Sequence, residues 1–220
     1  VHHVSTLAVF FDQVARGTRE ISERDAAMPS DGLKSGYVRS KYVAEKLVLA
    51  AARRGLPASI YRTSRLAGDR RTGATSNDKD LIASLLKACV LLAAYPDLAF
   101  EIALAPVDWV SQALMSLSRR PDGAGQAFHL FQPRPIAWPA LISMVQACGY
   151  PLTAMTYDAW RARLKQTADA GHPEREALAR LWMALGAGDT LLARRPRHQT
   201  PNSGPHLEAR RWPGAAPWRA

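Results

Sequence analysis

The chain has 220 residues, of which 47% are hydrophobic, so it is long enough and apolar enough to bury a core. No apolar run approaches the roughly 18 residues that a membrane-spanning helix needs, and no basic-then-apolar signal peptide opens the sequence. The formal net charge of +10 raises the question of nucleic-acid binding.

Part of the basic excess has a local source. Beyond residue 185 six arginines stand against two acidic residues: Arg194, Arg195, Arg197, Arg210, Arg211 and Arg219 against Asp189 and Glu208. The remaining charge is scattered in both signs, without zinc-finger spacing, an RNA-binding aromatic motif or a continuous basic helix. We therefore expect no nucleic-acid partner and no membrane partner.

The two cysteines predict neither a disulfide nor a metal site. Cys89 and Cys148 lie in apolar stretches without metal-ligand or CxxC spacing. We expect both to be buried free thiols in a reducing cytosol, and hence a cytoplasmic protein without a bound metal.

The first part of the chain predicts a βαβ unit. Residues 2–11 are apolar and β-rich, and we expect a buried strand that delivers the hydroxyls of Ser5 and Thr6. Residues 12–35 are polar and irregular and predict a long loop. A helix is expected from about residue 35 to 54, stopped by Gly55 and Pro57, and a compact strand follows at 58–63. Strand, helix and strand in this order indicate a parallel sheet.

The rest of the chain alternates helices and strands. Residues 64–80 are rich in Gly, Ser and Arg and form a predicted loop at the carboxyl end of a strand, the edge where open α/β sheets bind ligands. The next helix is expected at 81–94, with Asp78 or Asp80 as its cap, and Asp108 suits the first turn of a later helix. The other expected elements are strands at 98–105, 126–131 and 152–156, and helices starting at 106–110 and covering 136–147, 157–168 and 173–185.

Tyr37 and Lys41 form the strongest chemical signal. Residues four apart lie on the same helix face, so the phenol and the ammonium can act at one point. The cation then favours the phenolate and makes the hydroxyl a better proton donor and acceptor. A solvated pair on a helix surface has the same spacing, and Ser5 and Thr6 can equally be ordinary strand formers.

The order of these segments resembles the extended short-chain dehydrogenase/reductase superfamily. Within it, the chain is most similar to the thioester reductase domain of nonribosomal peptide synthetases, polyketide synthases and carboxylic acid reductases. The resemblance covers roughly residues 1–185 and is carried by residues 4–10, 36–47, 55–57, 61–62, 68–69, 71–73, 106–110, 128–130 and 149–152.

The resemblance implies a fold and a division of the chain. The fold class is α/β: the carboxyl-terminal part of a Rossmann-like doubly wound parallel sheet, with the amino-terminal half of the fold missing. Residues 1–132 would belong to this NAD(P)-binding domain and residues 133–185 to a small, mostly helical substrate lobe. Residues 186–220, rich in Arg and Pro, are expected to be a disordered tail.

The resemblance also implies catalytic roles. Thr6 and Tyr37 would hydrogen-bond the substrate carbonyl oxygen as negative charge develops on it. Tyr37 would supply the proton, while Lys41 would bind the nicotinamide ribose and lower the pKa of the tyrosine.

Cofactor contacts follow from the same resemblance. The segment after Tyr61-Arg62 would pack against the nicotinamide. The implied cofactor is NADPH, and the implied cofactor-binding residues are Ser5, Thr6, Tyr37, Lys41, Thr63, Ser64 and Arg65.

The implied reaction is reductive release. Hydride from NADPH would attack an acyl or peptidyl thioester on a phosphopantetheinyl carrier domain, and the hemithioacetal would collapse to an aldehyde and a thiol, with further reduction to an alcohol in some family members. Two alternatives stay open: an extended-family enzyme acting on a sugar nucleotide or a ketone, and a truncated fragment without catalysis.

The chain departs from the family in three places, one of which is the Arg- and Pro-rich tail beyond about residue 185, where the resemblance weakens. No G-x-x-G-x-x-G phosphate loop occurs in the 220 residues, so we expect the chain alone to be inactive without its upstream half. Thr63-Ser64 stands where the family usually has Pro-Gly.

The roles of several other residues can be interpreted in two ways. Three arginines, Arg65, Arg70 and Arg71, can contact phosphates or simply face solvent. His129 is expected to be structural, and Asp108 to be a helix cap.

Overall fold

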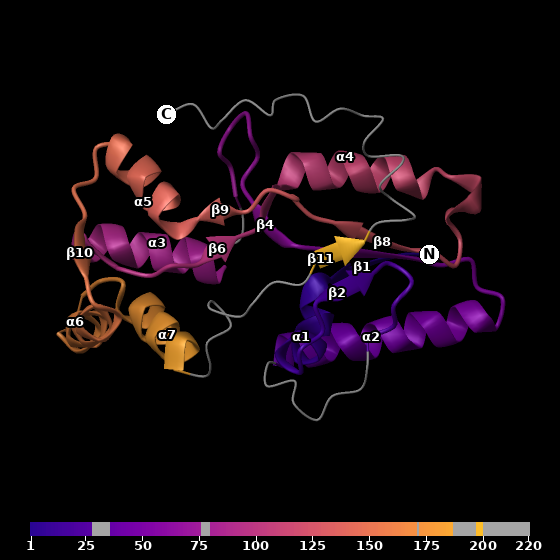
Figure 1. Cartoon of the computed structure of the whole chain (residues 1–220), viewed down its shortest axis with the longest axis horizontal. Helices are drawn as coiled ribbons and strands as arrows, with labels where there is room; N and C mark the ends of the chain where they lie inside the picture. Colours follow the sequence, from indigo (N-terminus) through magenta and orange to yellow (C-terminus); the bar gives the residue numbers. More distant parts are fainter. Residues whose placement is uncertain (28–35, 76–79, 171, 187–196, 200–220) are drawn as a thin grey trace. The chain divides into compact units, whose positions relative to one another are not determined.

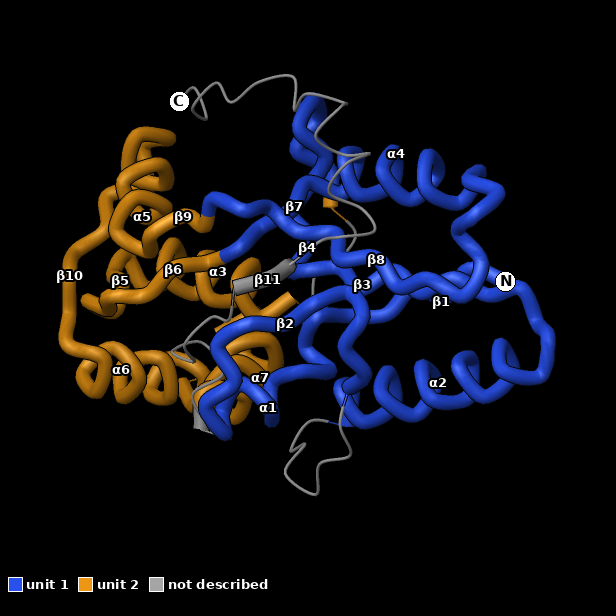
Figure 2. The backbone as a smooth tube through the Cα atoms, turned by 45° about the vertical axis from the view of Figure 1, so that its right-hand side comes forward, with its two compact units in different colours: residues 1–74, 103–134, 194–217 blue, residues 75–102, 135–193, 218–220 orange. Residues whose placement is uncertain are grey.

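The computed structural model describes residues 1–27, 36–75, 80–170, 172–186 and 197–199. The chain divides into two compact units, coloured separately in Figure 2. The first comprises residues 1–74, 103–134 and 194–217; the second comprises residues 75–102, 135–193 and 218–220. The second unit thus contains residues 75–102 as well as the stretch expected to form the helical lobe.

The first unit is built on a three-stranded parallel sheet. Its strands are β1 (His2–Thr6), β3 (Ser59–Thr63) and β8 (Ala127–Leu130), in the order β1-β3-β8. All five residues of the central strand β3 are buried. The parallel sheet and the βαβ unit predicted from the sequence are confirmed.

Two helices cover opposite faces of this sheet (Figure 1). The helix α2 (Gly36–Arg53) reaches Arg62 of β3, whereas α4 (Val107–Ser118) packs on Tyr61, the residue before it. Neighbouring residues of a strand point to opposite faces, so the two helices enclose the sheet between them. The α4 side is an apolar core in which Tyr61 stacks on Phe128 at 5.3 Å between ring centroids.

The first strand is shorter than predicted. The backbone turns after Thr6 into a 3₁₀ helix, η1 (Leu7–Phe10), followed by α1 (Phe11–Ala15). Thr6 caps η1, because its Oγ1 accepts a hydrogen bond from Ala8 N at 3.2 Å. The predicted loop at 12–35 is also wrong in its described part, since most of α1 and the short strand β2 (Glu20–Ser22) lie there.

Short parallel pairs complete the first unit, which also includes η2 (Pro121–Gly123). The strand β4 (Arg65–Ala67) lies in the expected loop at 64–80 and pairs with β7 (Leu104–Pro106). The strand β11 (Arg197–Gln199) pairs with β2, so these three residues are an exception to the expected disordered tail. The rest of that tail beyond Gly186 lies outside the described residues.

The second unit is mostly helical. Its helices are α3 (Leu81–Leu92), α5 (Trp138–Ala147), α6 (Tyr157–Asp169) and α7 (Arg175–Gly186). Asp80 caps α3, accepting from Ile82 N and Ala83 N. Its strands form two pairs: β5 (Ala94–Pro96) with β10 (Thr153–Met155), and β6 (Glu101–Ile102) with β9 (Ile136–Ala137).

Two tryptophans centre the second unit. Trp138 and Trp160 are fully buried. Their indole N–H groups donate to Pro96 O and Ala94 O, both at 2.9 Å. Both acceptors lie in β5, next to α3, which explains why residues 75–102 group with the later helices.

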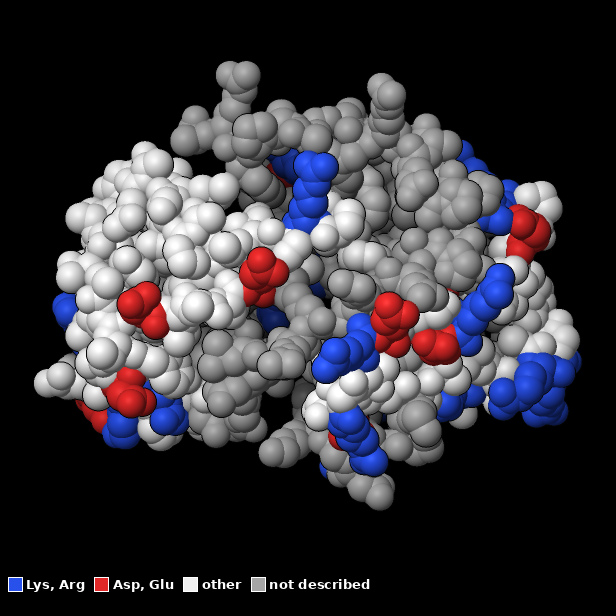
Figure 3. Space-filling view, viewed as in Figure 1, with Lys and Arg blue, Asp and Glu red and all other residues white. Residues whose placement is uncertain are grey.

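The predicted burial of the two cysteines is correct for only one of them. Cys89 is buried, which raises the pKa of its thiol to about 12, but Cys148 is exposed, contrary to the prediction. Basic and acidic side chains are interspersed on the face seen in Figure 3. The described helices include none with the length and apolarity to cross a membrane, and no cluster of His, Cys, Asp or Glu in the same part of the chain fits a metal.

Candidate functional site

Three of the predicted site residues, Thr6, Thr63 and Ser64, lie at the carboxyl edge of the β1-β3-β8 sheet. Thr6 is the last residue of β1 and pairs in register with Thr63, the last residue of β3. The chain continues from Thr63 into Ser64, whose backbone N–H donates to Leu130 O at the end of β8. Parallel strands therefore bring hydroxyl side chains from distant parts of the sequence to one edge.

Lys41 joins this edge from α2. Its Nζ donates to the backbone oxygen of Val4 at 3.0 Å, two residues before Thr6. Tyr37 lies one helical turn earlier on the same side of α2, and 59% of its surface is exposed. The structure thus brings Lys41 into contact with the strand that ends at Thr6, while Tyr37 is exposed to solvent.

The other predicted cofactor contacts differ in their surroundings. Ser5 is buried and its Oγ donates to Glu45 Oε2 at 2.8 Å, so its hydroxyl is used inside the protein. Thr63 is also buried, and its Oγ1 lies 3.4 Å from the backbone oxygen of Ser5. Ser64 Oγ is buried and has no hydrogen-bond partner within the described part of the chain, while Arg65 lies in β4.

A buried polar cluster lies beneath these residues, on the α2 side of the sheet. It consists of Ser5, Glu23, Glu45, Arg62 and His129, each no more than 2% exposed. The guanidinium of Arg62 contacts Glu45 through Nε at 3.0 Å and through Nη2 at 2.5 Å, and His129 Nε2 lies 3.2 Å from Arg62 Nη1. We call this set the Glu45 cluster.

Sequence reasoning assigned no role to this cluster apart from Ser5. Glu45 follows Lys41 by four residues and Tyr37 by eight, so its spacing places it on the same side of the helix. This spacing could have identified Glu45 as a residue on that side of α2, but spacing does not show that a side chain is buried. His129, expected to be structural, lies inside the cluster, and its backbone N–H donates to Glu23 Oε1 at 2.6 Å.

Asp108 and Arg70 form an ion pair away from α2. Arg70 donates to the carboxylate of Asp108 through its backbone N–H at 3.2 Å and through Nε at 2.9 Å. These hydrogen bonds lower the pKa of Asp108 below its usual value. The Arg70 guanidinium is thus bound to the first turn of α4, whereas the Arg71 side chain is 83% exposed.

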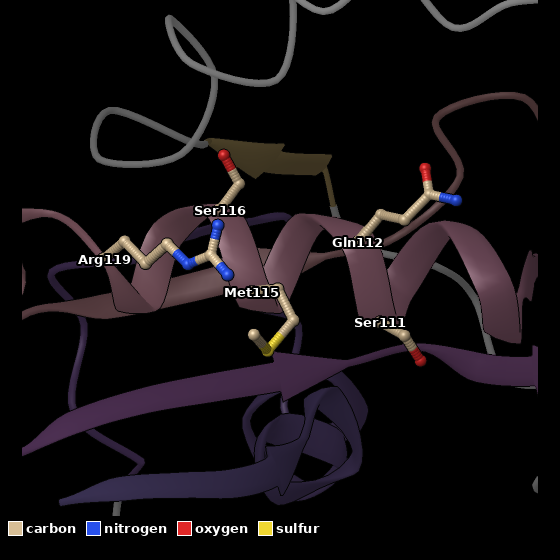
Figure 4. A pocket seen from close by; sticks show the side chains of 5 residues that line it. All are labelled: Ser111, Gln112, Met115, Ser116 and Arg119. Carbon is tan, nitrogen blue, oxygen red and sulfur yellow. The ribbon is translucent and has the colours of Figure 1, made fainter.

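A shallow pocket lies elsewhere, on the outer helix α4 (Figure 4). Its described lining consists of Ser111, Gln112, Met115, Ser116 and Arg119. Because α4 covers the sheet face opposite to α2, this pocket is separate from the edge that carries Tyr37 and Lys41.

Comparison with known proteins identifies the family to which the chain belongs. A family model described as "Male sterility protein", of an NAD-binding type, matches residues 1–114. The chain is 34% identical over 170 residues to a linear gramicidin synthase of Brevibacillus parabrevis, covering 76% of this chain and 3% of that protein. It is 38% identical over 144 residues to an isonitrile lipopeptide synthase of Streptomyces coeruleorubidus, covering 64% of this chain and 10% of that one.

A solved structure agrees with these sequence matches. The terminal R domain from the myxalamid PKS-NRPS biosynthetic pathway superposes with a TM-score of 0.79 at 33% identity, covering 94% of this chain and 51% of that domain. The chain therefore spans about half the length of that domain and a small part of the synthases. It belongs to the male sterility family of NAD-binding proteins, as part of a thioester reductase (R) domain of the extended short-chain dehydrogenase/reductase superfamily.

Proposed function

We propose that this chain supplies the catalytic half of an NADPH-dependent reductase that releases a carrier-bound acyl or peptidyl thioester as an aldehyde. The single observation that carries the proposal is the hydrogen bond from Lys41 Nζ to Val4 O. It holds the ammonium on the strand that ends in Thr6, one turn from the exposed phenol of Tyr37. Family membership supports the same function.

The donors at this edge fit the nicotinamide and ribose end of a dinucleotide. An ammonium and hydroxyls suit ribose oxygens, and Ser64 Oγ, which is buried and has no partner among the described residues, offers one more polar contact. Lys41, Tyr37 and Ser64 would hold this end of the cofactor. When bound, a reduced nicotinamide supplies the hydride that attacks the substrate carbonyl.

The chain's own residues stabilise the negative charge that develops on the carbonyl oxygen and supply the proton. The hydroxyls of Thr6 and Tyr37 donate hydrogen bonds to the carbonyl oxygen, which stabilises the negative charge that develops on it. The Oγ1 of Thr6 accepts from Ala8 N, which leaves its proton available for this bond and fixes the side chain. Tyr37 gives its proton to the oxygen, and the Lys41 cation lies one helical turn away on the same side of α2.

A carrier domain is the proposed partner. Reductive cleavage of a thioester consumes one hydride and one proton and yields an aldehyde and a free thiol. A phosphopantetheinyl thiol is the leaving group that a synthetase supplies, and both relatives named above are synthases. The open position of Tyr37 is compatible with a substrate delivered on a long arm.

The test uses the full-length polypeptide that carries these 220 residues. NADPH oxidation is followed by absorbance with an acyl-pantetheine thioester as substrate, and the aldehyde is trapped and identified. Tyr37→Phe removes the proton donor, and we expect kcat to fall about 10²- to 10⁴-fold. Tyr150→Phe changes a similarly exposed tyrosine of the second unit and should leave kcat unchanged.

Two results would contradict the proposal. Full activity of Tyr37→Phe would remove the tyrosine from the mechanism. Turnover of a sugar nucleotide or a simple ketone, without turnover of the thioester, would favour the alternative activity within the same superfamily.

A further inference from the structure

The Glu45 cluster contains charges that the proposed reaction does not use. Glu45 is 1% exposed and Arg62 is 2% exposed, and the ring of Phe10 lies 4.8 Å from the Arg62 guanidinium carbon. Burying a charged pair has a high desolvation cost, which hydrophobic residues of the same volume would avoid. The position of the pair therefore calls for an explanation beyond stability.

Each oxygen of the Glu45 carboxylate binds a different strand. Oε2 accepts from Ser5 Oγ of β1 at 2.8 Å, and Oε1 accepts from Arg62 Nε of β3 at 3.0 Å. One side chain of α2 thus contacts two adjacent strands at the same time. This double contact fixes both the rotation of α2 about its axis and its position along the strands.

Glu45 and the two residues that it contacts are neighbours of the proposed site. Ser5 precedes Thr6, Arg62 precedes Thr63, and Glu45 follows Lys41 by one helical turn. A slip of α2 by one residue would rotate Tyr37 and Lys41 by about 100° away from Thr6. An apolar pair could pack as tightly but would not set this rotation, because dispersion contacts are not directional.

We propose that Glu45, with Ser5 and Arg62, is a positioning group that sets the rotation of α2 and so aims Tyr37 and Lys41 at the end of β1. This inference rests on the proposed function for the roles of Tyr37 and Lys41. The geometric part concerns the Lys41 to Val4 hydrogen bond and can be measured without any activity.

Two variants separate positioning from stability. Glu45→Leu with Arg62→Met replaces the pair by apolar residues of similar volume, a change that is often neutral for folding. Glu45→Asp keeps the charge but is one methylene shorter, so its carboxylate cannot reach both strands unless α2 moves. Ser59→Ala is the matched control: Ser59 is buried in β3 and its Oγ donates to Gly123 O at 2.8 Å, a contact remote from α2.

The geometric readout is the carbonyl carbon shift of Val4. Labelling valine carbonyl carbons and serine nitrogens gives cross-peaks only for Val-Ser sequences, which occur at 4–5 and 110–111. The second, within α4, reports whether each variant is folded. The variant Lys41→Met gives the reference chemical shift of the Val4 carbonyl carbon without the hydrogen bond from Lys41. We expect this shift to move toward the reference value in the double variant and in Glu45→Asp. In Ser59→Ala we expect it to keep the wild-type value.

The kinetic readout is made in the full-length polypeptide. We expect kcat to fall about 10²-fold in the double variant and in Glu45→Asp, with KM for the thioester roughly unchanged, since the reacting groups are misplaced while the binding contacts remain.

The outcomes are distinguishable. A folded double variant with the wild-type Val4 shift would overturn the inference, and if that variant does not fold, the same result in Glu45→Asp would overturn it. An equal change of the Val4 shift in Ser59→Ala would also overturn the inference, because the shift would then report a general loss of packing and not the position of α2. If the wild-type polypeptide reduces no thioester, the proposed function fails, whereas the Val4 shift still decides whether the cluster positions α2.

Discussion

Asp108 shows how one side chain can join two segments of the first unit. The prediction that it caps α4 is wrong: Pro106 is the N-cap residue, and Asp108 lies in the first turn with its carboxylate bound by Arg70, from the loop after β4. An acidic residue is expected there from the sequence, because a carboxylate is favourable near a helix N-terminus. Its partner could not be identified in the same way, since residues 38 positions apart carry no spacing signal.

The stability of this pair should depend on pH in a defined direction. The pKa of Asp108 is lowered from 3.8 by the hydrogen bonds from Arg70, so its contribution is present above about pH 4 and disappears as pH falls through the lowered value. We expect Arg70→Met to unfold at lower urea concentration than wild type at pH 7, by about 0.5–1 kcal/mol, and this difference to shrink below pH 4.

Urea unfolding from pH 7 to pH 3 measures this difference. Arg71→Met removes an 83% exposed side chain whose Nε lies 3.7 Å from Asp69 Oδ1, and it is the control for the loss of an exposed ion pair. A difference that grows as pH falls would contradict the assignment of the pKa shift to Arg70.

The ends of the elements depend on single residues. The helix α2 ends where Gly55 adopts a φ of +98°, and the N–H groups of Gly55 and Leu56 bond back to Ala52 O and Ala51 O. The Gly and Pro signals placed this end within one residue. The end of β1 was missed, because the Thr6 side chain accepts from Ala8 N and caps η1, and an apolar run does not reveal such a contact.

Gly55→Ala should destabilise the first unit. A side chain at this φ is strained although the added Cβ meets no atom within 4 Å, so we expect a loss of about 1–2 kcal/mol from backbone strain alone. Gly36→Ala, at the start of the same helix and equally free of contacts, should be neutral or slightly stabilising. Thermal unfolding of both variants tests this, and equal effects would contradict it.

The whole chain combines two units, and the candidate site lies in one of them. The edge with Thr6, Tyr37 and Lys41 belongs entirely to the first unit, and its donors suit the nicotinamide and ribose end of a dinucleotide. No G-x-x-G-x-x-G run accompanies them in the sequence. Such a turn uses a helix N-terminus to bind the pyrophosphate.

The 220-residue chain should therefore bind NADPH and reduced nicotinamide mononucleotide with similar affinity, within about tenfold, or about 1.4 kcal/mol. Calorimetric titration of both ligands measures the difference. Lys41→Met should weaken both by the same factor. NADPH binding about 100-fold tighter than the mononucleotide would reveal a phosphate site in this chain and contradict the prediction.

The sequence alone determined the α/β class, the βαβ order and the Tyr37–Lys41 pair, because periodicity and i,i+4 spacing are local properties of the chain. Tertiary structure decided the rest. The pairing of β2 with β11, the grouping of residues 75–102 with the later helices and the burial of Glu45 against Ser5 and Arg62 each join segments far apart in sequence. Local patterns show which face of an element a residue occupies, but only packing shows what that face meets.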